Sequence, residues 1–163
     1  MRRYSRYQTV VLKLEEIIQL LDKFCFIKEV KIMKKRLLYL ILPLITLVLE
    51  ILPYGAVCNF ANPEGEAWRV TFSYFDLTPF GYANFAPLIT AILTCIILIL
   101  LVIYLITGKQ SLATAARYTA FLCAIVSIAP LLLGINFFSV VGTLITITLI
   151  AEFILLFFSI KNP

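Results

Sequence analysis

Four long runs of apolar residues limit what this chain can fold into. They lie at about residues 37–53, 84–107, 112–133 and 137–158. The chain is 62% hydrophobic, against roughly 45–50% in an ordinary soluble domain, which is more than one small core can bury. Runs of this length match a bilayer, and backbone groups in lipid must bond within their own segment. The sequence therefore predicts an all-α membrane protein, a bundle of four transmembrane helices.

Glycine, proline and small polar residues indicate where these helices end or bend. Gly108 is a natural stop for the second run, because glycine readily adopts the left-handed conformation that ends a helix. Ser111 and Asn136 are expected to cap the third and fourth helices. Pro43 and Pro130 fall within runs, where we expect local kinks.

The distribution of charge predicts the topology. Ten of the fourteen basic residues lie between Arg2 and Arg36, ahead of the first run, and Lys109 and Lys161 follow later runs. Basic residues next to membrane spans mark the cytoplasmic side and argue against nucleic-acid binding. We expect a multi-pass plasma-membrane protein with both termini in the cytoplasm and residues 54–82 outside, where Arg69 is the exception.

Residues 1–32 are predicted to be an amphipathic cytoplasmic segment. Apolar residues recur at helical spacing from Val10 to Phe24, with charges between them, as in a helix lying on the inner leaflet. Alternatively, translation starts at Met33, because residues 28–30 can be encoded by a bacterial ribosome-binding sequence. A start there would resemble a signal peptide. However, Tyr54 stands where cleavage needs a small residue, so we expect an uncleaved helix.

The loop between the first two runs is predicted to form a short β-hairpin. Residues 69–74 alternate polar and apolar, and residues 55–60 can pair with them across a turn at 62–66. Nine of the chain's aromatic residues lie between Tyr54 and Phe85. They can rest on the bilayer surface, pack the hairpin on the helix ends, or bind a ligand. The candidate extracellular interaction surface consists of Trp68, Phe72, Tyr74, Phe75, Phe80 and Tyr82.

Two carboxylates within the apolar runs are candidate functional groups, because a charge inside a bilayer is costly. Arg117 and Glu152 reach equal depth if the third and fourth helices form a hairpin. Their ion pair would either hold the third and fourth helices together or belong to a proton or ion relay. Glu50 would either pair with Arg69, stapling the loop to the first helix, or lie among the lipid headgroups.

The remaining residue pattern argues against an enzyme. The chain has no histidine and four widely spaced cysteines, so we expect no catalytic residues, no metal and no cofactor. Cys95 and Cys123 come to similar depth and are interpreted as apolar packing. Small residues suggest close helix contacts, or contacts with another protein's helix. The two small faces consist of Ala116, Ala120 and Ala124, and of Thr143, Ile147 and Ala151.

The stretch from Asn62-Pro63-Glu64-Gly65-Glu66-Ala67-Trp68 through residues 75–85 resembles small, uncharacterised four-span membrane proteins of Gram-positive bacteria. The resemblance covers the four spans but not residues 1–32, and it implies a bacterial plasma membrane without naming an activity. Claudins are similar in overall plan only. Trp68 is present here, but the cysteine pair of the claudin loop is missing.

Together these features favour a non-enzymatic membrane protein, an accessory or regulatory subunit of a membrane complex that presents loop 54–82 outside. The expected partners are the bilayer and a second membrane protein or further copies of the chain, with no nucleic acid. The alternative is a small transporter or channel component that uses the intramembrane carboxylate of Glu152.

Overall fold

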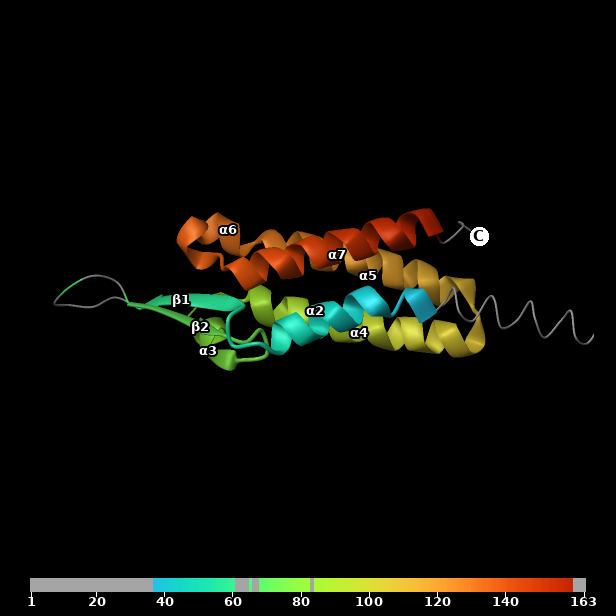
Figure 1. The fold of residues 1–163 in the computed structure, drawn as a ribbon, viewed down its shortest axis with the longest axis horizontal. Helices are drawn as coiled ribbons and strands as arrows, with labels where there is room; N and C mark the ends of the chain where they lie inside the picture. The colour runs from blue at the N-terminus through green and yellow to red at the C-terminus, as the bar shows by residue number, and fades with distance from the viewer. Residues whose placement is uncertain (1–36, 61–64, 66–67, 83, 160–163) are drawn as a thin grey trace, which may run out of the picture. The chain divides into compact units, whose positions relative to one another are not determined.

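A computed structural model describes residues 37–60, 65, 68–82 and 84–159. The chain divides into two units, residues 1–38 and 39–163. Of the first unit only Leu37 and Leu38 are described, and both are helical. The expected amphipathic segment 1–32 and the start at Met33 therefore lie outside the described residues. The described part of the second unit is mostly helical, with a two-stranded sheet at one end (Figure 1).

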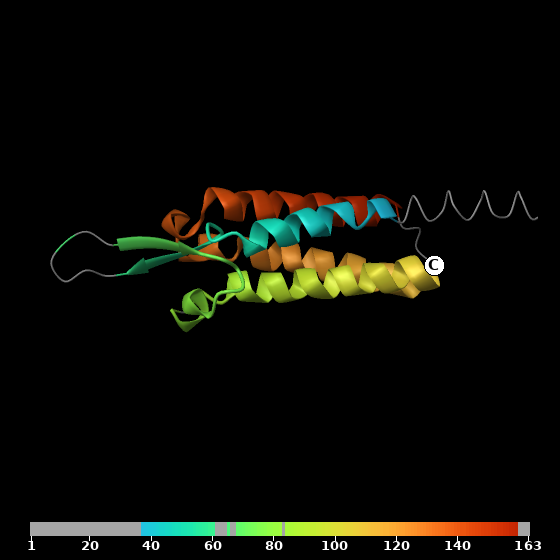
Figure 2. The same ribbon diagram turned by 60° about the horizontal axis from the view of Figure 1, so that its bottom comes forward.

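Four helices of the second unit lie side by side (Figure 2), and their contacts join them in a closed ring. Each helix has two main neighbours, because α2 and α5 both pack on α4 and on α7. The short elements gather at the hairpin end of this ring. The ring helices are α2 (Ile41–Ile51), α4 (Ala86–Thr107), α5 (Gln110–Ile128) and α7 (Val140–Ser159). The short elements are α3 (Leu77–Gly81), α6 (Pro130–Leu133) and the 3-10 turn η1 (Ile135–Phe137).

Three of the described helices are long and apolar enough to cross a membrane, not clearly four. They span Ala86–Thr107, Gln110–Leu133 and Val140–Ser159, close to the expected limits. The expected span at 37–53 is interrupted, because the chain turns at residues 39–40 and α2 has only 11 residues. Pro43 explains the interruption, since its ring clashes with the carbonyl of Tyr39 and offers it no N–H.

The helix ends confirm some expectations and correct others. Gly108 ends α4 in the left-handed conformation (φ 68°), and its N–H donates to the carbonyl of Tyr104 at 2.8 Å. Pro130 separates α5 from α6. Ser111 does not cap α5, which already begins at Gln110. Asn136 lies in η1, and Ser139 caps α7 instead by accepting a hydrogen bond from Gly142 N–H at 2.8 Å.

The predicted hairpin is present. Strand β1 (Ala56–Phe60) pairs antiparallel with β2 (Trp68–Phe72), in a register that joins Ala56 to Phe72 and Phe60 to Trp68. Most of the intervening turn lies outside the described residues. The pairing leaves Val57 fully buried, whereas the side chain of Trp68 is exposed. One end of the sheet thus packs on the bundle and the other projects from it (Figure 1).

Small side chains on α5 allow its neighbours to approach closely. Ala116 and Ala120 are fully buried, as expected for a face of small residues in a membrane bundle. On α7, Thr143 and Ile147 are exposed, so the expected close contact of this face within the bundle is wrong, while its contact with another protein's helix stays a prediction. A different face of α7, with mostly larger side chains, is buried in the core. This face consists of Gly142, Ile145, Thr146, Leu149, Glu152 and Leu156.

A tight junction fixes the hairpin to the helix ends. The Ser139 hydroxyl donates to the carbonyl of Gly55 at 2.6 Å, while the N–H of Tyr74 donates to the carbonyl of Glu50 at 2.9 Å. The ring of Tyr74 is buried against Gly55. Burial, together with the nearby carboxylate of Glu50, raises the pKa of Tyr74, so its hydroxyl stays protonated. Gly142 lies against the same hydroxyl, and a Cβ there would be 3.3 Å from it.

Replacing Gly55 by alanine should destabilise the protein. The added Cβ would lie 2.8 Å from Cδ1 and Cε1 of Tyr74, a buried ring with little room to move. Overpacking of this kind costs about 1–3 kcal/mol. Thermal unfolding in detergent, followed by circular dichroism, measures the effect. Gly81→Ala is the matched control, because nothing lies within 4 Å of its added Cβ. Equal melting of both variants would contradict this account.

Candidate functional site

Polar side chains from all four ring helices are buried in the bundle interior. Charged residues are rare in membrane helices and mark candidate sites, whereas serine and threonine are common where such helices pack together. The group combines carboxylates, hydroxyls and one guanidinium. Its members are Thr46, Glu50, Thr90, Thr94, Arg117, Ser127, Thr146 and Glu152.

Glu50 is fully buried and binds a hydroxyl rather than a cation. Thr94 of α4 donates to Oε1 of Glu50 at 2.8 Å, and Glu50 Oε2 has no hydrogen-bond partner in the described part of the chain. Arg69 is exposed and donates instead to the carbonyl of Phe138 at 3.0 Å. Glu50 therefore takes neither expected position. It is not stapled to Arg69 and does not lie at the surface, because α2 turns it toward α4.

Cys123 extends this contact to a third helix. Its thiol donates to the carbonyl of Thr90 at 3.5 Å and lies 3.7 Å from the hydroxyl of Thr94. Glu50, Thr94 and Cys123 thus connect α2, α4 and α5. The thiol is buried as expected, but its contacts with Thr90 and Thr94 are polar rather than the expected apolar packing, and Cys95 is half-buried.

Glu152 is the second buried carboxylate. It is 0% exposed, and neither carboxylate oxygen has a hydrogen-bond partner among the described residues. Arg117 is also buried, with its guanidinium carbon 5.2 Å from the ring centre of Tyr118 and 5.7 Å from that of Phe157. Arg117 therefore donates no hydrogen bond to Glu152 in this structure, and their ion pair in the membrane stays a prediction.

The two carboxyl groups belong to the same interior. Glu50 of α2 and Glu152 of α7 are both fully buried among the ring helices. Between their helices, Thr46 of α2 donates to Thr148 of α7 at 2.9 Å, and Thr148 donates to the carbonyl of Ile145 at 2.8 Å. This chain of hydroxyls holds α2 against α7. The described interior thus contains carboxyl, hydroxyl and thiol groups.

A second candidate site is the aromatic surface at the hairpin end. Trp68 is 69% exposed and Tyr82 64% exposed, and both rings lie near Phe60, at centre distances of 6.4 and 4.8 Å. We call the exposed rings of Trp68 and Tyr82, with Phe60 between them, the hairpin surface. Phe75 and Phe80 are also exposed.

Two residues expected on this surface lie elsewhere. Tyr74 is buried at the junction with Gly55, and Phe72 is half-buried against the core. Alternation along β2 could not settle this, because Tyr74 follows the end of the strand and the chain turns there. Burial of the Tyr74 ring makes it part of the scaffold that holds the hairpin.

Sequence reasoning also missed Thr90 and Thr94, the partners of Cys123 and Glu50. A usable signal was present. The two threonines stand four residues apart in a helix that is otherwise almost entirely apolar, so they share one face. Polar residues at this spacing indicate a helix face turned toward other helices rather than toward lipid.

No protein-family profile, curated protein or solved structure matches the chain. The resemblance to small four-span proteins of Gram-positive bacteria therefore stays an expectation. Any function has to be inferred from the geometry of the two candidate sites.

The two buried polar groups should respond differently to substitution. Glu152→Met removes a carboxylate without a hydrogen-bond partner, so it should leave stability unchanged or raise it by about 1–3 kcal/mol. Thr94→Val removes the hydrogen bond to Glu50 and should lower stability by a similar amount. Thermal unfolding in detergent compares both with the wild type. A large loss of stability in Glu152→Met would mean that Glu152 does have a partner, such as Arg117.

Proposed function

We propose that this chain is a non-enzymatic membrane protein that serves as an accessory or regulatory subunit of a membrane complex. In this proposal it crosses a bacterial plasma membrane four times, with α2 extended by its flanking residues. Both termini then lie in the cytoplasm and loop 54–82 lies outside. The hairpin surface is the part that contacts the partner.

The exposed pair of Trp68 and Tyr82 is the observation that carries this proposal. Tryptophan and tyrosine are the residues most enriched at the energetic centres of protein interfaces. The hairpin that holds Trp68 is fixed to the bundle through Ser139 and Gly55, and through Arg69 and the carbonyl of Phe138. A surface that is already ordered loses little conformational entropy on binding, so more of the contact energy is left for affinity.

The packing of the bundle interior also favours a binding role over conduction by a single chain. Large side chains from two helices are fully buried beside the carboxylates. They leave α4 and α7 in close contact with their neighbours, so an ion would have to displace them. These side chains are Ile97 and Leu101 of α4, and Ile145, Leu149 and Leu156 of α7.

Native mass spectrometry of the protein, extracted gently from its own membrane, tests the partner role. Wild-type protein should be recovered in a heteromeric complex of defined mass. Trp68→Ala and Tyr82→Ala should each lower the recovered complex by about tenfold or more, as loss of an interface hot spot does. Phe158→Ala is the control, because this ring is 81% exposed near the end of α7, in a different part of the chain.

Only a monomer or a homo-oligomer in the wild-type spectrum would contradict the accessory role. Retention of the complex in both hairpin variants would instead remove the hairpin surface as the contact. In that case the aromatic rings would serve as anchors at the lipid headgroups, where tryptophan and tyrosine are also favoured.

A second candidate function is supported by Glu152. A fully buried carboxylate in a membrane helix, without a hydrogen-bond partner among the described residues, is a candidate proton or ion carrier. In this alternative the chain is a small transporter or channel component, and Glu50 and Thr94 form a second step of the relay.

Proton-coupled flux into proteoliposomes distinguishes this alternative. If Glu152 carries the proton, Glu152→Gln should abolish the flux, because an amide has a similar shape but does not titrate. Glu152→Asp keeps a titratable group and should retain part of the flux. Equal flux in wild type and Glu152→Gln, with folding intact, rules the carrier role out.

A further inference from the structure

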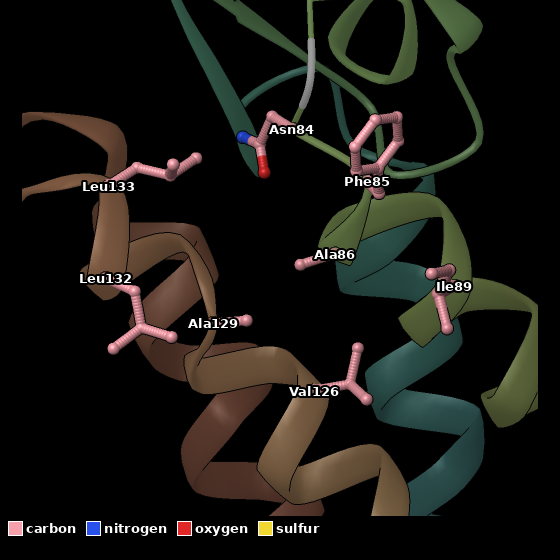
Figure 3. Close-up of a pocket in the computed structure, with 8 residues that line it drawn as sticks. All are labelled: Asn84, Phe85, Ala86, Ile89, Val126, Ala129, Leu132 and Leu133. Carbon is pink, nitrogen blue, oxygen red and sulfur yellow. The ribbon is translucent and has the colours of Figure 1, made fainter.

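A pocket of about 290 Å³ lies at the hairpin end, between the start of α4 and the α5–α6 corner (Figure 3). Its walls are apolar side chains from both sides, among them Ile89 of α4, Val126 of α5 and Leu132 of α6. Leu132 is 88% exposed, so the pocket opens to the surface of the bundle. In a membrane this opening would face lipid.

One polar group is directed into this pocket. Asn84 is only 3% exposed, and its Nδ2 donates to the carbonyl of Val57 at 3.2 Å. The carbonyl can only accept, which fixes the orientation of the amide. The Oδ1 atom of Asn84 has no hydrogen-bond partner in the described part of the chain, and Figure 3 shows it pointing toward the pocket.

Because Oδ1 of Asn84 lacks a partner among the described residues, the pocket favours a ligand that carries a hydrogen-bond donor. Buried polar atoms are nearly always hydrogen-bonded, because leaving one without a partner costs free energy. A single water would fill the need poorly, since a stable buried water makes two to four hydrogen bonds and the other lining side chains are apolar. A ligand with one donor and an apolar body suits the pocket better.

Charge and size narrow the class of ligand. None of the described residues that line the pocket is acidic or basic, so they offer no counter-ion to an ammonium or a phosphate. Its volume of about 290 Å³ is many times the roughly 10–15 Å³ that a cavity needs to hold one water. That is room for a hydroxyl group and the first part of one hydrocarbon chain, with the rest of the chain in the bilayer.

We propose that this pocket binds a neutral lipid alcohol whose hydroxyl donates a hydrogen bond to Oδ1 of Asn84. The start of the chain packs on Ile89, Val126 and Leu132. The site lies beside β1, because Asn84 also donates a hydrogen bond to the carbonyl of Val57. A bound ligand would therefore stabilise the position of the hairpin relative to α4. This inference needs a membrane location but not the accessory role, and either can fail without the other.

Competition on full-length protein in phosphatidylcholine nanodiscs tests the site. Phosphatidylcholine has no hydrogen-bond donor, so it does not supply the proposed group. A photoreactive long-chain alcohol is crosslinked, and 1-dodecanol and dodecyl methyl ether are used as competitors with the same chain. We expect the alcohol to compete about tenfold more strongly, which corresponds to about 1.4 kcal/mol. Crosslinks should map to the start of α4 and to α5–α6. Equal competition by the ether overturns the proposal.

Two variants locate the interaction. Asn84→Leu removes the acceptor, so the alcohol should lose its advantage over the ether. This variant also loses the hydrogen bond to Val57 and can unfold, so Ala129→Phe serves as the second variant. It keeps Asn84 but fills the pocket, and should lower crosslinking severalfold, whereas Gly81→Ala should leave it unchanged. Wild-type crosslinking in Ala129→Phe overturns the proposal.

Discussion

Close packing along the alanine face of α5 is the contact on which the bundle depends. Lipid is as apolar as the helix surfaces, so it provides no hydrophobic drive between helices, and association relies on close fit and hydrogen bonds. Ala113, Ala116 and Ala120 are fully buried and let α4 and α7 approach α5. This approach encloses the carboxylates of Glu50 and Glu152. The same feature therefore accounts for a compact bundle and for a polar interior.

Local residue chemistry predicts much of this fold. Gly108 and Pro130 act within a few residues of their own positions, and the hairpin is indicated by alternation along residues 69–74 together with the turn-rich residues 62–66 before them. The first span is interrupted at residues 39–40, and Pro43 accounts for this because proline does not continue the helix hydrogen bonds of the preceding turn. Hydropathy measures composition along the chain, whereas the start of α2 depends on the backbone geometry that a proline allows.

The candidate sites were less predictable because they depend on how each helix is rotated about its axis. Counting residues predicts that Arg117 and Glu152 lie at equal depth, but depth alone does not determine whether the two groups face each other. Glu50 and Thr94 are far apart in sequence, and they meet because α2 and α4 both turn these residues toward the bundle interior. The sequence shows which residues are polar, while their partners follow from packing of the whole ring.

The hydrogen bonds of Ser139 have a mechanical consequence. This one hydroxyl holds the first residue before β1 through Gly55 and the first turn of α7 through Gly142. Tyr74 makes a similar connection from the end of β2 to the last turn of α2. A force applied to the hairpin would thus be transmitted to the two helices that bear Glu50 and Glu152. Movement of the hairpin is therefore coupled to the ends of α2 and α7.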